Sequence, residues 1–430
     1  MTLVSRLSER WKGISTPFLV YGDRELHFSD IEQDQSIDLS QVRPGDVVAL
    51  IGDFEPASIS ALLRLIDLNA ILVPLTRETA HDHEYFFDTA GVDVVVDGTR
   101  THRRTNAGAN PLVEQLREQR HAGLVLFSTG TTGRPKAILH DMTLFLRRFE
   151  TPRPTFRTLN FLLFDHIGGI NTLLHTIFNR GVVISPTDRT VSGVLETCRR
   201  YEVEVLPTTP TFLRMILMSG LTRTFPPSVR VITYGTERMD QPTLQELCDL
   251  LPDVDFRQTF GMSELGILRV KSEARDSLFM KIGGEGVETR IDDGVLKIKS
   301  STRMLGYLNA PSPFDADGWY DTKDIVESRD GMIKVTGRVS DVINVGGLKF
   351  MPSEIERHAL EFPGVSQAKA VARNNPITGQ HVELLVEENQ GAEVDLAGLR
   401  QFLAERLQPH MRPHRVKLGT VQVGHRFKKS

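Results

Sequence analysis

The sequence has little cysteine and no strong excess of charge of either sign. Its 430 residues include two cysteines, Cys198 and Cys248, and neither lies in a CxxC pair or at a metal-ligand spacing. We therefore expect two reduced thiols rather than a disulfide scaffold or a zinc site. The formal net charge of -4 gives no electrostatic reason to expect nucleic acid or an anionic membrane as a partner.

Long apolar runs and export signals are also missing from the sequence. No uninterrupted apolar stretch approaches the length of a membrane span, and the N-terminal segment MTLVSRLSERWKGIS has no signal-peptide core. We therefore expect a cytoplasmic protein with no membrane segment. Repeats and low-complexity tracts are absent to inspection, which argues against a solenoid or a disordered scaffold. The choice between a monomer and a homodimer stays open.

Short β-branched runs alternate with longer amphipathic segments between about residues 45 and 260. The segments DVVALIG, PASISALLRLIDLNA and ILVPL, for example, read as strand, helix and strand. This alternation predicts parallel sheets covered by helices, with ligand sites at the carboxyl ends of the strands.

The pattern changes after about residue 290, where GVLKIKS, GWYDTKDIVES and GMIKVTG read as short antiparallel strands. A compact stretch of mixed helices and strands then follows GRVSD. We therefore expect an α/β protein with a large N-terminal domain, residues 1–338, built of βαβ sheets flanked by helices with a small antiparallel subdomain. A small, mobile α+β C-terminal domain, residues 341–430, should follow, with a hinge near Ser340.

One Gly-rich and Thr-rich segment, FSTGTTGRPKA at residues 127–137, follows the apolar run LVLF. Glycine lets backbone amides turn toward an anion, hydroxyls add donors, and Lys136 adds a positive charge, so the segment could hold several phosphate oxygens. It is not the common P-loop, because that motif needs Gly-Lys and no such pair occurs in the chain. Taken alone, the segment could equally be a surface turn.

Four motifs in order give the chain a resemblance to the acyl-adenylate-forming enzymes, which include acyl-CoA synthetases, peptide-synthetase adenylation domains and firefly luciferase. The motifs are STGTTGRPKA, QTFGMSE at 258–264, GWYDTKD at 318–324 and GRVSDVINVGGLKFMPSEIE at 337–356. The sequence departs from the usual pattern where Phe260 replaces Tyr, Ser263 replaces Thr and Lys323 replaces Gly.

The resemblance implies a site for ATP, with the loop on the β and γ phosphates, Phe260 on adenine and Ser263 at the α-phosphate. Asp324 would accept both ribose hydroxyls, and Arg338 would contact the ribose or a phosphate. Glu264 would hold Mg²⁺. The nucleotide-binding residues so implied are Thr129, Gly130, Thr131, Thr132, Gly133, Lys136, Phe260, Gly261, Ser263, Asp324 and Arg338.

The resemblance also implies a lysine near the C-terminus that bridges the reacting carboxylate and phosphate. The ending VGHRFKKS makes Lys428 the candidate and Lys429 its rival. The catalytic residues would then be Lys428, Glu264 and His166. His166 could gate the acid, orient its carboxylate or fill the core.

The acid pocket is implied to contain His166, Tyr234, Gly235, Thr236, Thr259 and Met262. Tyr234 is bulky, which favours an aryl acid or a short to medium acyl chain. The pocket segments offer no acidic residue placed to hold an α-amino group, so amino acids are disfavoured as substrates.

The implied reaction converts an acid and ATP to acyl-AMP and pyrophosphate. The acyl group then passes to the thiol of CoA or of phosphopantetheine on an acyl carrier protein, along a path containing Gly346, Gly347 and Lys349. Two alternatives remain: transfer to an amine, which would make an amide synthetase, and a non-catalytic nucleotide-binding homologue. The second alternative is motivated by Lys323, Ser340 and the unusual C-terminal ending.

Overall fold

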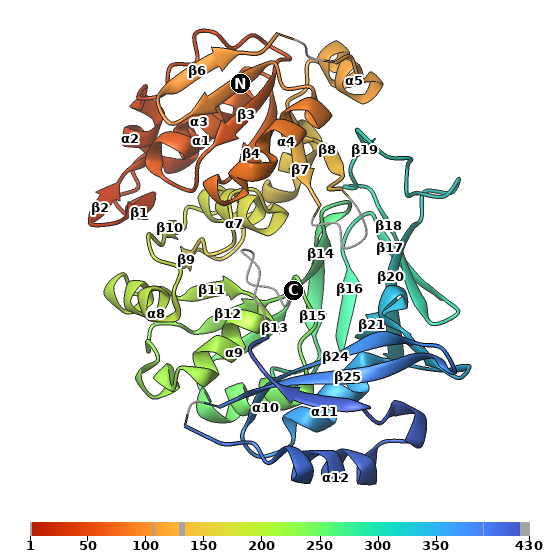
Figure 1. Ribbon diagram of the computed structural model, residues 1–430. Helices are drawn as coiled ribbons and strands as arrows, with labels where there is room; N and C mark the ends of the chain where they lie inside the picture. The colour runs from red at the N-terminus through yellow and green to blue at the C-terminus, as the bar shows by residue number, and fades with distance from the viewer. Residues whose placement is uncertain (1, 106–107, 129–133, 390, 422–430) are drawn as a thin grey trace.

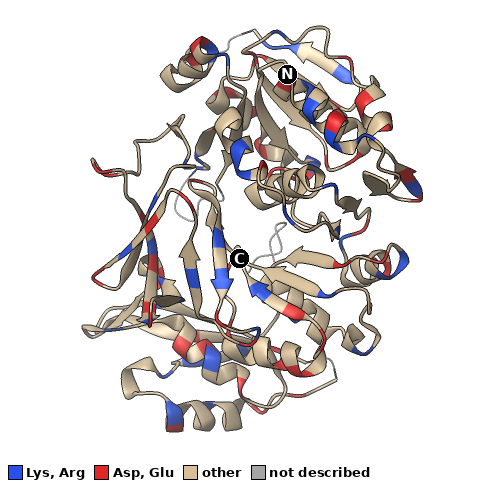
Figure 2. Ribbon diagram, turned by 180° about the vertical axis from the view of Figure 1, so that it is seen from behind, with Lys and Arg blue, Asp and Glu red and all other residues tan. Residues whose placement is uncertain are grey.

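The computed structural model describes residues 2–105, 108–128, 134–389 and 391–421. Two sheets with helices fill the first part of the chain, a third sheet stands beside them, and the C-terminal residues form a smaller layer next to the third sheet (Figure 1). This architecture confirms the expected α/β fold class. No helix in the described ranges is long and apolar enough to cross a membrane. Acidic and basic residues are interspersed along the ribbon (Figure 2).

The first sheet carries the loop at residues 127–137 between two of its strands. In spatial order the strands are β19 (Gly306–Tyr307), β8 (Ala137–Asp141), β7 (Gly123–Phe127), β4 (Ile71–Leu75), β3 (Val47–Ile51), β5 (Val94–Asp97) and β6 (Arg100–Arg103). Strands β3, β4, β5 and β7 are parallel, and β8 returns antiparallel to β7. The apolar run before the loop is therefore a buried strand, as the sequence predicted.

The second sheet is parallel except for β2 at one edge. Its strands, in spatial order, are β13 (Asp255–Gln258), β12 (Val231–Tyr234), β11 (Val205–Thr208), β9 (Arg157–Leu159), β10 (Val182–Ser185), β1 (Leu19–Tyr21) and β2 (Arg24–Leu26). Because the six strands other than β2 run in one direction, their carboxyl ends lie along the same edge.

Helices cover these sheets and connect their strands. They are α1 (Leu3–Trp11), α2 (Phe28–Gln33), α3 (Pro56–Asp67), α4 (His83–Ala90), α5 (Pro111–Gln119), α6 (Met142–Leu146), α7 (Ile167–Phe178), α8 (Val191–Arg200), α9 (Pro210–Met218) and α10 (Gln241–Leu250). Short 3₁₀ turns include η1 (Arg77–Asp82), η2 (Arg147–Phe149) and η3 (Leu221–Thr224). Leu62 of α3 and Leu173 of α7 belong to one buried core, so these helices pack into the same interior.

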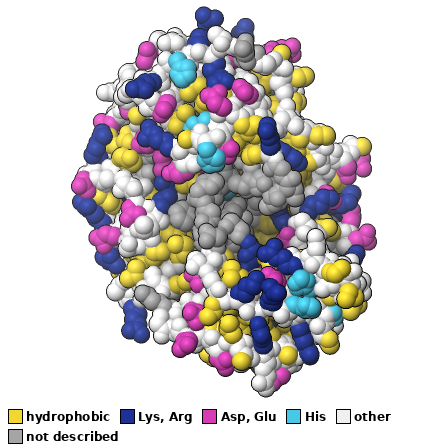
Figure 3. All heavy atoms as spheres, in the orientation of Figure 1, with side chains coloured by type: hydrophobic (Ala, Val, Ile, Leu, Met, Phe, Trp, Pro, Cys, Tyr) yellow, Lys and Arg dark blue, Asp and Glu magenta, His cyan; other side chains and the backbone are white. Residues whose placement is uncertain are grey.

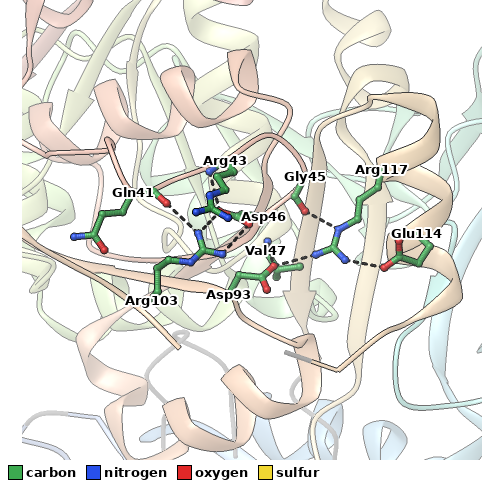
Figure 4. A network of polar contacts seen from close by, with 9 residues as sticks. All are labelled: Gln41, Arg43, Gly45, Asp46, Val47, Asp93, Arg103, Glu114 and Arg117. Carbon is green, nitrogen blue, oxygen red and sulfur yellow. Dashed lines mark hydrogen bonds and ion pairs between the residues drawn. The ribbon is translucent and has the colours of Figure 1, made fainter. Parts of the chain in front are cut away.

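Two arginines hold the outer strands of the first sheet together (Figure 4). Arg103 of β6 donates hydrogen bonds of 2.7 Å and 3.2 Å to the two carboxylate oxygens of Asp46. Arg117 of α5 donates to three acceptors, the carboxylates of Asp93 and Glu114 and the carbonyl of Gly45. These contacts fix β5, β6 and α5 against the start of β3.

The third sheet is antiparallel, as expected, but it begins earlier in the chain than the sequence predicted. Its strands, in spatial order, are β14 (Phe260–Met262), β15 (Gly266–Ser272), β16 (Met280–Gly283), β21 (Met332–Arg338), β20 (Tyr320–Arg329), β18 (Val295–Ser300) and β17 (Val287–Asp292). The change of pattern lies near residue 260 because β14 and β15 are joined by a tight turn rather than by a helix.

Residues after β21 form a unit with its own hydrophobic core. Its elements are η4 (Val339–Asp341), β22 (Ile343–Val345), β23 (Leu348–Phe350), α11 (Pro352–Leu360), β24 (Val365–Asn375), β25 (Gly379–Glu388), α12 (Leu396–Arg406), η5 (Pro409–Met411) and β26 (Arg415–Leu418). The core runs from Ile343 to Val416. It contacts α9 and α10 through β24 and α11.

Candidate active site

The strands β7 and β8 hold the two ends of the Gly-rich loop together. The Lys136 amide donates to Ser128 Oγ at 3.0 Å, and the Ser128 amide donates to the Lys136 carbonyl at 3.0 Å. Lys136 Nζ lies 4.8 Å from the centroid of the Tyr307 ring. The predicted phosphate ligands within the loop, Thr129, Gly130, Thr131, Thr132 and Gly133, lie outside the described residues. The loop is therefore anchored at both ends, with its lysine over an aromatic face.

Glu264 lies on the tight turn between β14 and β15, where two tyrosines meet it. The Tyr307 hydroxyl donates to Glu264 Oε1 at 2.7 Å, and Tyr320 interacts with both Glu264 and Tyr307. Burial, together with the negative charge of Glu264, raises the pKa of both phenols above the ordinary value. Both hydroxyls therefore remain protonated donors at neutral pH. Neither tyrosine was among the predicted site residues, although Tyr320 lies within the GWYDTKD motif.

A buried histidine links the loop strand to the Glu264 turn. His140 of β8 lies with Nε2 2.6 Å from the Ser263 carbonyl oxygen. Burial lowers the pKa of His140 to about 4, so the ring is neutral at pH 7 and its Nε2–H donates this bond. His140 was not among the predicted site residues, and its position in the strand after the loop is the signal that could have found it.

Asp324 and Arg338 face each other across β20 and β21. They occupy paired positions, and Arg338 Nε donates to Asp324 Oδ1 at 2.9 Å. Asp324 is only 5% exposed, and burial raises the pKa of its carboxyl against the opposing effect of Arg338. Its own amide donates to Thr322 Oγ1 at 3.0 Å. The structure therefore brings together the two residues expected at the ribose.

The predicted acid pocket is tightly built at the end of β12. A Cβ on Gly235 would overlap Thr259 Oγ1, and that hydroxyl donates to the Tyr234 carbonyl at 3.1 Å. Thr236 has a φ of +71°, which is rare for a β-branched residue, and its buried hydroxyl has no partner among the described residues. Backbone strain of this kind is concentrated at functional sites.

Buried polar side chains with unpartnered atoms occur at the carboxyl ends of strands in the second sheet. Each of five neighbouring strand ends carries a buried side-chain atom with no hydrogen-bond partner in the described ranges, at Asn160, Ser185, Thr208, Tyr234 and Gln258. Buried polar groups without partners cost about 1–3 kcal/mol each. This edge is where open parallel sheets bind ligands, and a polar ligand would satisfy such atoms.

His166 caps the first turn of α7 beside this edge. Its Nδ1 accepts the Gly168 amide at 3.0 Å, which places the ring proton on Nε2. Glycine is needed at the next position too, because a Cβ on Gly169 would overlap the Leu163 carbonyl oxygen. His166 is half-buried.

The segment around β14 lies partly in the core of the third sheet. Phe260 is 9% exposed and packs in that core, with Met262 against it. Gly261 permits close pairing, since a Cβ there would lie 2.7 Å from the Gly266 carbonyl oxygen. The adenine contact of Phe260 stays a prediction.

The proposed thiol path and the C-terminal lysine lie in the last unit of the chain. Gly346 and Gly347, with φ of +60° and +89°, form the two-residue turn between β22 and β23, and Lys349 beside them is exposed. Lys428 and its rival Lys429 lie outside the described residues.

Glu264 is the single carboxylate expected to hold Mg²⁺. The part of the chain that the structure describes contains no group of three or more His, Cys, Asp or Glu side chains able to hold a metal ion. One carboxylate nevertheless fits Mg²⁺, which is commonly bound by one or two carboxylates together with substrate phosphates and water.

The chain resembles known proteins in sequence and in fold. Residues 103–293 match the family model described as AMP-binding enzyme. The chain is 23% identical over 321 residues to 4-coumarate–CoA ligase 4 of Arabidopsis thaliana, covering 66% of this chain and 56% of that protein. It is 29% identical over 304 residues to the fatty acid–[acyl-carrier-protein] ligase MmaC of Mycobacterium marinum, covering 61% and 57%. The chain therefore matches just over half the length of these relatives.

The similarity in fold covers more of the chain than residues 103–293. The crystal structure of the anthranilate CoA ligase AuaEII in complex with anthranoyl-AMP superposes with a TM-score of 0.81 at 17% identity. The superposition covers 99% of this chain and 95% of that one. Residues 103–293 thus match the AMP-binding enzyme model, and the chain shares its fold with the anthranilate CoA ligase structure.

Proposed function

We propose that this protein activates a carboxylic acid with ATP and then transfers the acyl group to a thiol. The observation that carries the proposal is one contact network joining separate motifs. Lys136 of the loop lies over Tyr307, Tyr307 donates to Glu264, and Tyr320 of GWYDTKD meets the same carboxylate. Asp324 and its partner Arg338 lie farther along β20 and β21. Residues far apart in sequence thus meet as an ATP site requires.

The first step needs charge neutralisation more than it needs a base. A carboxylic acid with a pKa near 4 to 5 is ionised at pH 7, so its oxygen can attack the α-phosphorus directly. The bond from that phosphorus to the bridging oxygen breaks, and pyrophosphate leaves with the electron pair. Because nucleophile and phosphates are all anionic, cations and amide donors must lower the barrier.

The residues of the chain divide this work. The loop residues Thr129 to Gly133 and Lys136 bind the β and γ phosphates, Ser263 contacts the α-phosphate, and Phe260 and Gly261 lie beside the adenine. Asp324 accepts the ribose hydroxyls, because a carboxylate has about four acceptor positions and Arg338 occupies one in this structure. Lys428 bridges the carboxylate and the α-phosphate.

Mg²⁺ held near Glu264 would supply further neutralisation of phosphate charge. The two tyrosines beside Glu264 fix its orientation as hydrogen-bond donors. Lys and Arg side chains gather just below the centre of the visible face, toward the third sheet and the C-terminal unit (Figure 3). A positive surface of this kind favours the approach of a polyanionic nucleotide.

In the second step, the thiol of CoA or phosphopantetheine attacks the carbonyl carbon of the acyl-AMP. The C–O bond to AMP breaks, AMP leaves, and the thiol proton passes to solvent. We propose that residues 341–430 rotate relative to residues 1–338 about Ser340, which brings Gly346, Gly347 and Lys349 to the site. The separate hydrophobic core of this unit and the exposed turn η4 support such a motion.

The acid is proposed to be aryl or of short to medium length. His166, Tyr234, Gly235, Thr236, Thr259 and Met262 would surround it. The unpartnered polar atoms along the strand ends favour an acid with polar substituents over a long alkyl chain. The protein would act in the cytoplasm as a monomer or homodimer, with an acyl carrier protein as a possible partner.

Acid-dependent exchange of labelled pyrophosphate into ATP tests the adenylation step. A broad panel of aryl and aliphatic acids should contain members that support exchange. Mass spectrometry of the products with CoA, carrier proteins and amines then identifies the acceptor. Absence of exchange with every acid would instead support the non-catalytic nucleotide-binding alternative, and an amide product would support the amide synthetase.

A further inference from the structure

One buried arginine has no counter-charge in the part of the chain that the structure describes. Arg148 lies on η2, and its Nε, Nη1 and Nη2 atoms are all buried without a hydrogen-bond partner there. Its contacts are with the Phe145 ring, whose centroid lies 4.1 Å from the guanidinium carbon, and with the backbone near Gly266. Burial lowers the pKa of Arg148 to about 10, so it remains charged at neutral pH.

Another deeply buried arginine, Arg214, is paired with a carboxylate. Arg214 donates hydrogen bonds of 3.1 Å and 2.7 Å to Asp240, so its charge is neutralised within the fold. A buried charge without a partner is strongly unfavourable and persists where function requires it. Arg148 is the only arginine in the described ranges with all three guanidinium nitrogens buried and unpartnered.

The guanidinium of Arg148 lies against the turn that carries Glu264. A Cβ built on Gly266 would lie 2.7 Å from Nη1 and 2.8 Å from Nη2, so the close approach depends on glycine. Gly266 pairs with Met262, one of the residues proposed to contact the acid. The positive charge of Arg148 also contributes to the lowered pKa of His140, which binds Ser263 on the same turn.

We propose that the acid carries a second anionic group, a carboxylate or a sulfonate, and that Arg148 binds it. The inference rests on the proposed adenylating function and specifies its substrate class. The flat guanidinium can donate two parallel hydrogen bonds to such a group. An anion bound there would neutralise the buried charge at the moment the substrate enters, which makes acids with one charge poor substrates.

Paired acids of equal length, with and without a second carboxylate, test this proposal by pyrophosphate exchange. The wild-type protein should prefer the dianionic member of each pair. In Arg148→Met the ratio of kcat/KM for dianionic over monoanionic acids should fall by about 100-fold. Arg148→Lys should give an intermediate ratio, because lysine keeps the positive charge but cannot donate two parallel hydrogen bonds. The control Arg147→Met, at the exposed neighbouring position on η2, should leave the ratio unchanged.

A second measurement separates ligand recognition from a structural role. Arg148→Met should raise the melting temperature of the free protein or leave it unchanged, because it removes an unpaired buried charge. Calorimetry with non-hydrolysable acyl-sulfamoyl adenosine analogues should show that only the analogue with the second carboxylate loses affinity. A lower melting temperature with equal losses for both analogues would overturn the proposal.

Failure of the substrate inference and failure of the proposed function give different results. Exchange supported only by monoanionic acids would refute the role of Arg148 and leave adenylation intact. If no acid supports exchange, the proposed function fails, and the calorimetric comparison still decides whether Arg148 recognises a second anionic group.

Discussion

At the scale of single residues, the site depends on side chains whose ionisation is fixed by burial. His140 is neutral and donates to Ser263, while the tyrosines beside Glu264 keep their protons. Asp324 is buried yet keeps an arginine partner. Each of these groups therefore presents a defined set of donors and acceptors to the site.

His140 should make stability depend on pH below neutrality. Its pKa is about 4 in the folded protein and about 6.5 when unfolded, so between these values the unfolded state binds more protons. The contribution is complete above pH 6.5 and is lost as the pH falls toward 4, by about 1.4 kcal/mol per pH unit at most. Chemical denaturation between pH 4 and 6.5 should show that the free energy of unfolding changes less steeply with pH in His140→Gln than in the wild type.

The exposed His102 provides the control for this prediction. His102→Gln should reproduce the wild-type pH dependence of the free energy of unfolding. An equal change of slope in both variants would contradict the assignment to His140.

Asp324→Asn should weaken ATP use without unfolding the protein. The change removes the charged partner of Arg338 and one set of acceptors expected at the ribose. The kcat/KM for ATP should fall by an amount equivalent to about 2–3 kcal/mol. The nearby Asp321→Asn, which alters an exposed pair with Lys323, should have little effect. An unchanged value for Asp324→Asn would remove this residue from the ribose site.

At the scale of elements, strand β20 carries a residue in a costly conformation. Lys323 has a φ of +61°, and its Nζ lies 2.7 Å from Asp321 Oδ2. Positive φ is the conformation that glycine adopts without cost, which explains physically why the related motif usually has glycine here.

Lys323→Gly should therefore stabilise the protein by about 1 kcal/mol, as measured by chemical denaturation. The kcat/KM for ATP should stay at the wild-type value, because the exposed side chain points to Asp321 rather than to Asp324. Lys323→Ala is the control, since it removes the ion pair but keeps the strained conformation. Equal stability of the Gly and Ala variants would show that backbone strain is not the cause.

The ion pairs between α5 and the first sheet should contribute to stability. Arg117→Met removes three hydrogen bonds, two of which join α5 to Gly45 before β3 and to Asp93 before β5, and should lower the free energy of unfolding by roughly 1–2 kcal/mol. Arg100→Met, at an exposed position of β6, should change it by less than about 0.5 kcal/mol. Similar losses in both variants would contradict a specific role for this network.

At the scale of the whole molecule, polar side chains join the C-terminal unit to the rest of the described chain. Arg238 lies 3.7 Å from Glu356 of α11, and it also donates to the carbonyl of Thr336, which belongs to β21, at 3.2 Å. Ser353 Oγ donates to the same carbonyl at 3.1 Å. Contacts of this kind can break and reform at low cost, which suits the proposed rotation about η4.

Ser340→Pro should separate the two half-reactions. Proline fixes φ at residue 340 and restricts Val339, so the proposed pivot loses freedom. Pyrophosphate exchange should be retained while transfer from supplied acyl-AMP to the thiol falls about tenfold or more. Ser340→Ala should behave like the wild type. A parallel loss of both activities in the proline variant would argue against a hinge at this position.

Much of the fold followed from periodicity and turn residues, because β-branched runs and amphipathic segments report burial directly. The early start of the third sheet was missed because β14 and β15 are short and joined by a turn. The motifs predicted Glu264, Asp324 and Arg338 as site residues, and the structure pairs Asp324 with Arg338. Tyr307 and Arg148 were not predicted because long-range strand pairing and burial bring them near these residues, and no local sequence pattern reports either. His140 could have been found from its position in the strand that follows the loop.

The hydrogen bond from His140 to the Ser263 carbonyl ties together two parts of the candidate site that both lie outside the C-terminal unit. It joins β8, which follows the proposed phosphate loop, to the turn of the third sheet that holds Glu264, so these parts would keep their spacing during the proposed rotation of the C-terminal unit. The two half-reactions would then share one stationary platform, and the rotating unit would change only which chemical group is delivered to it.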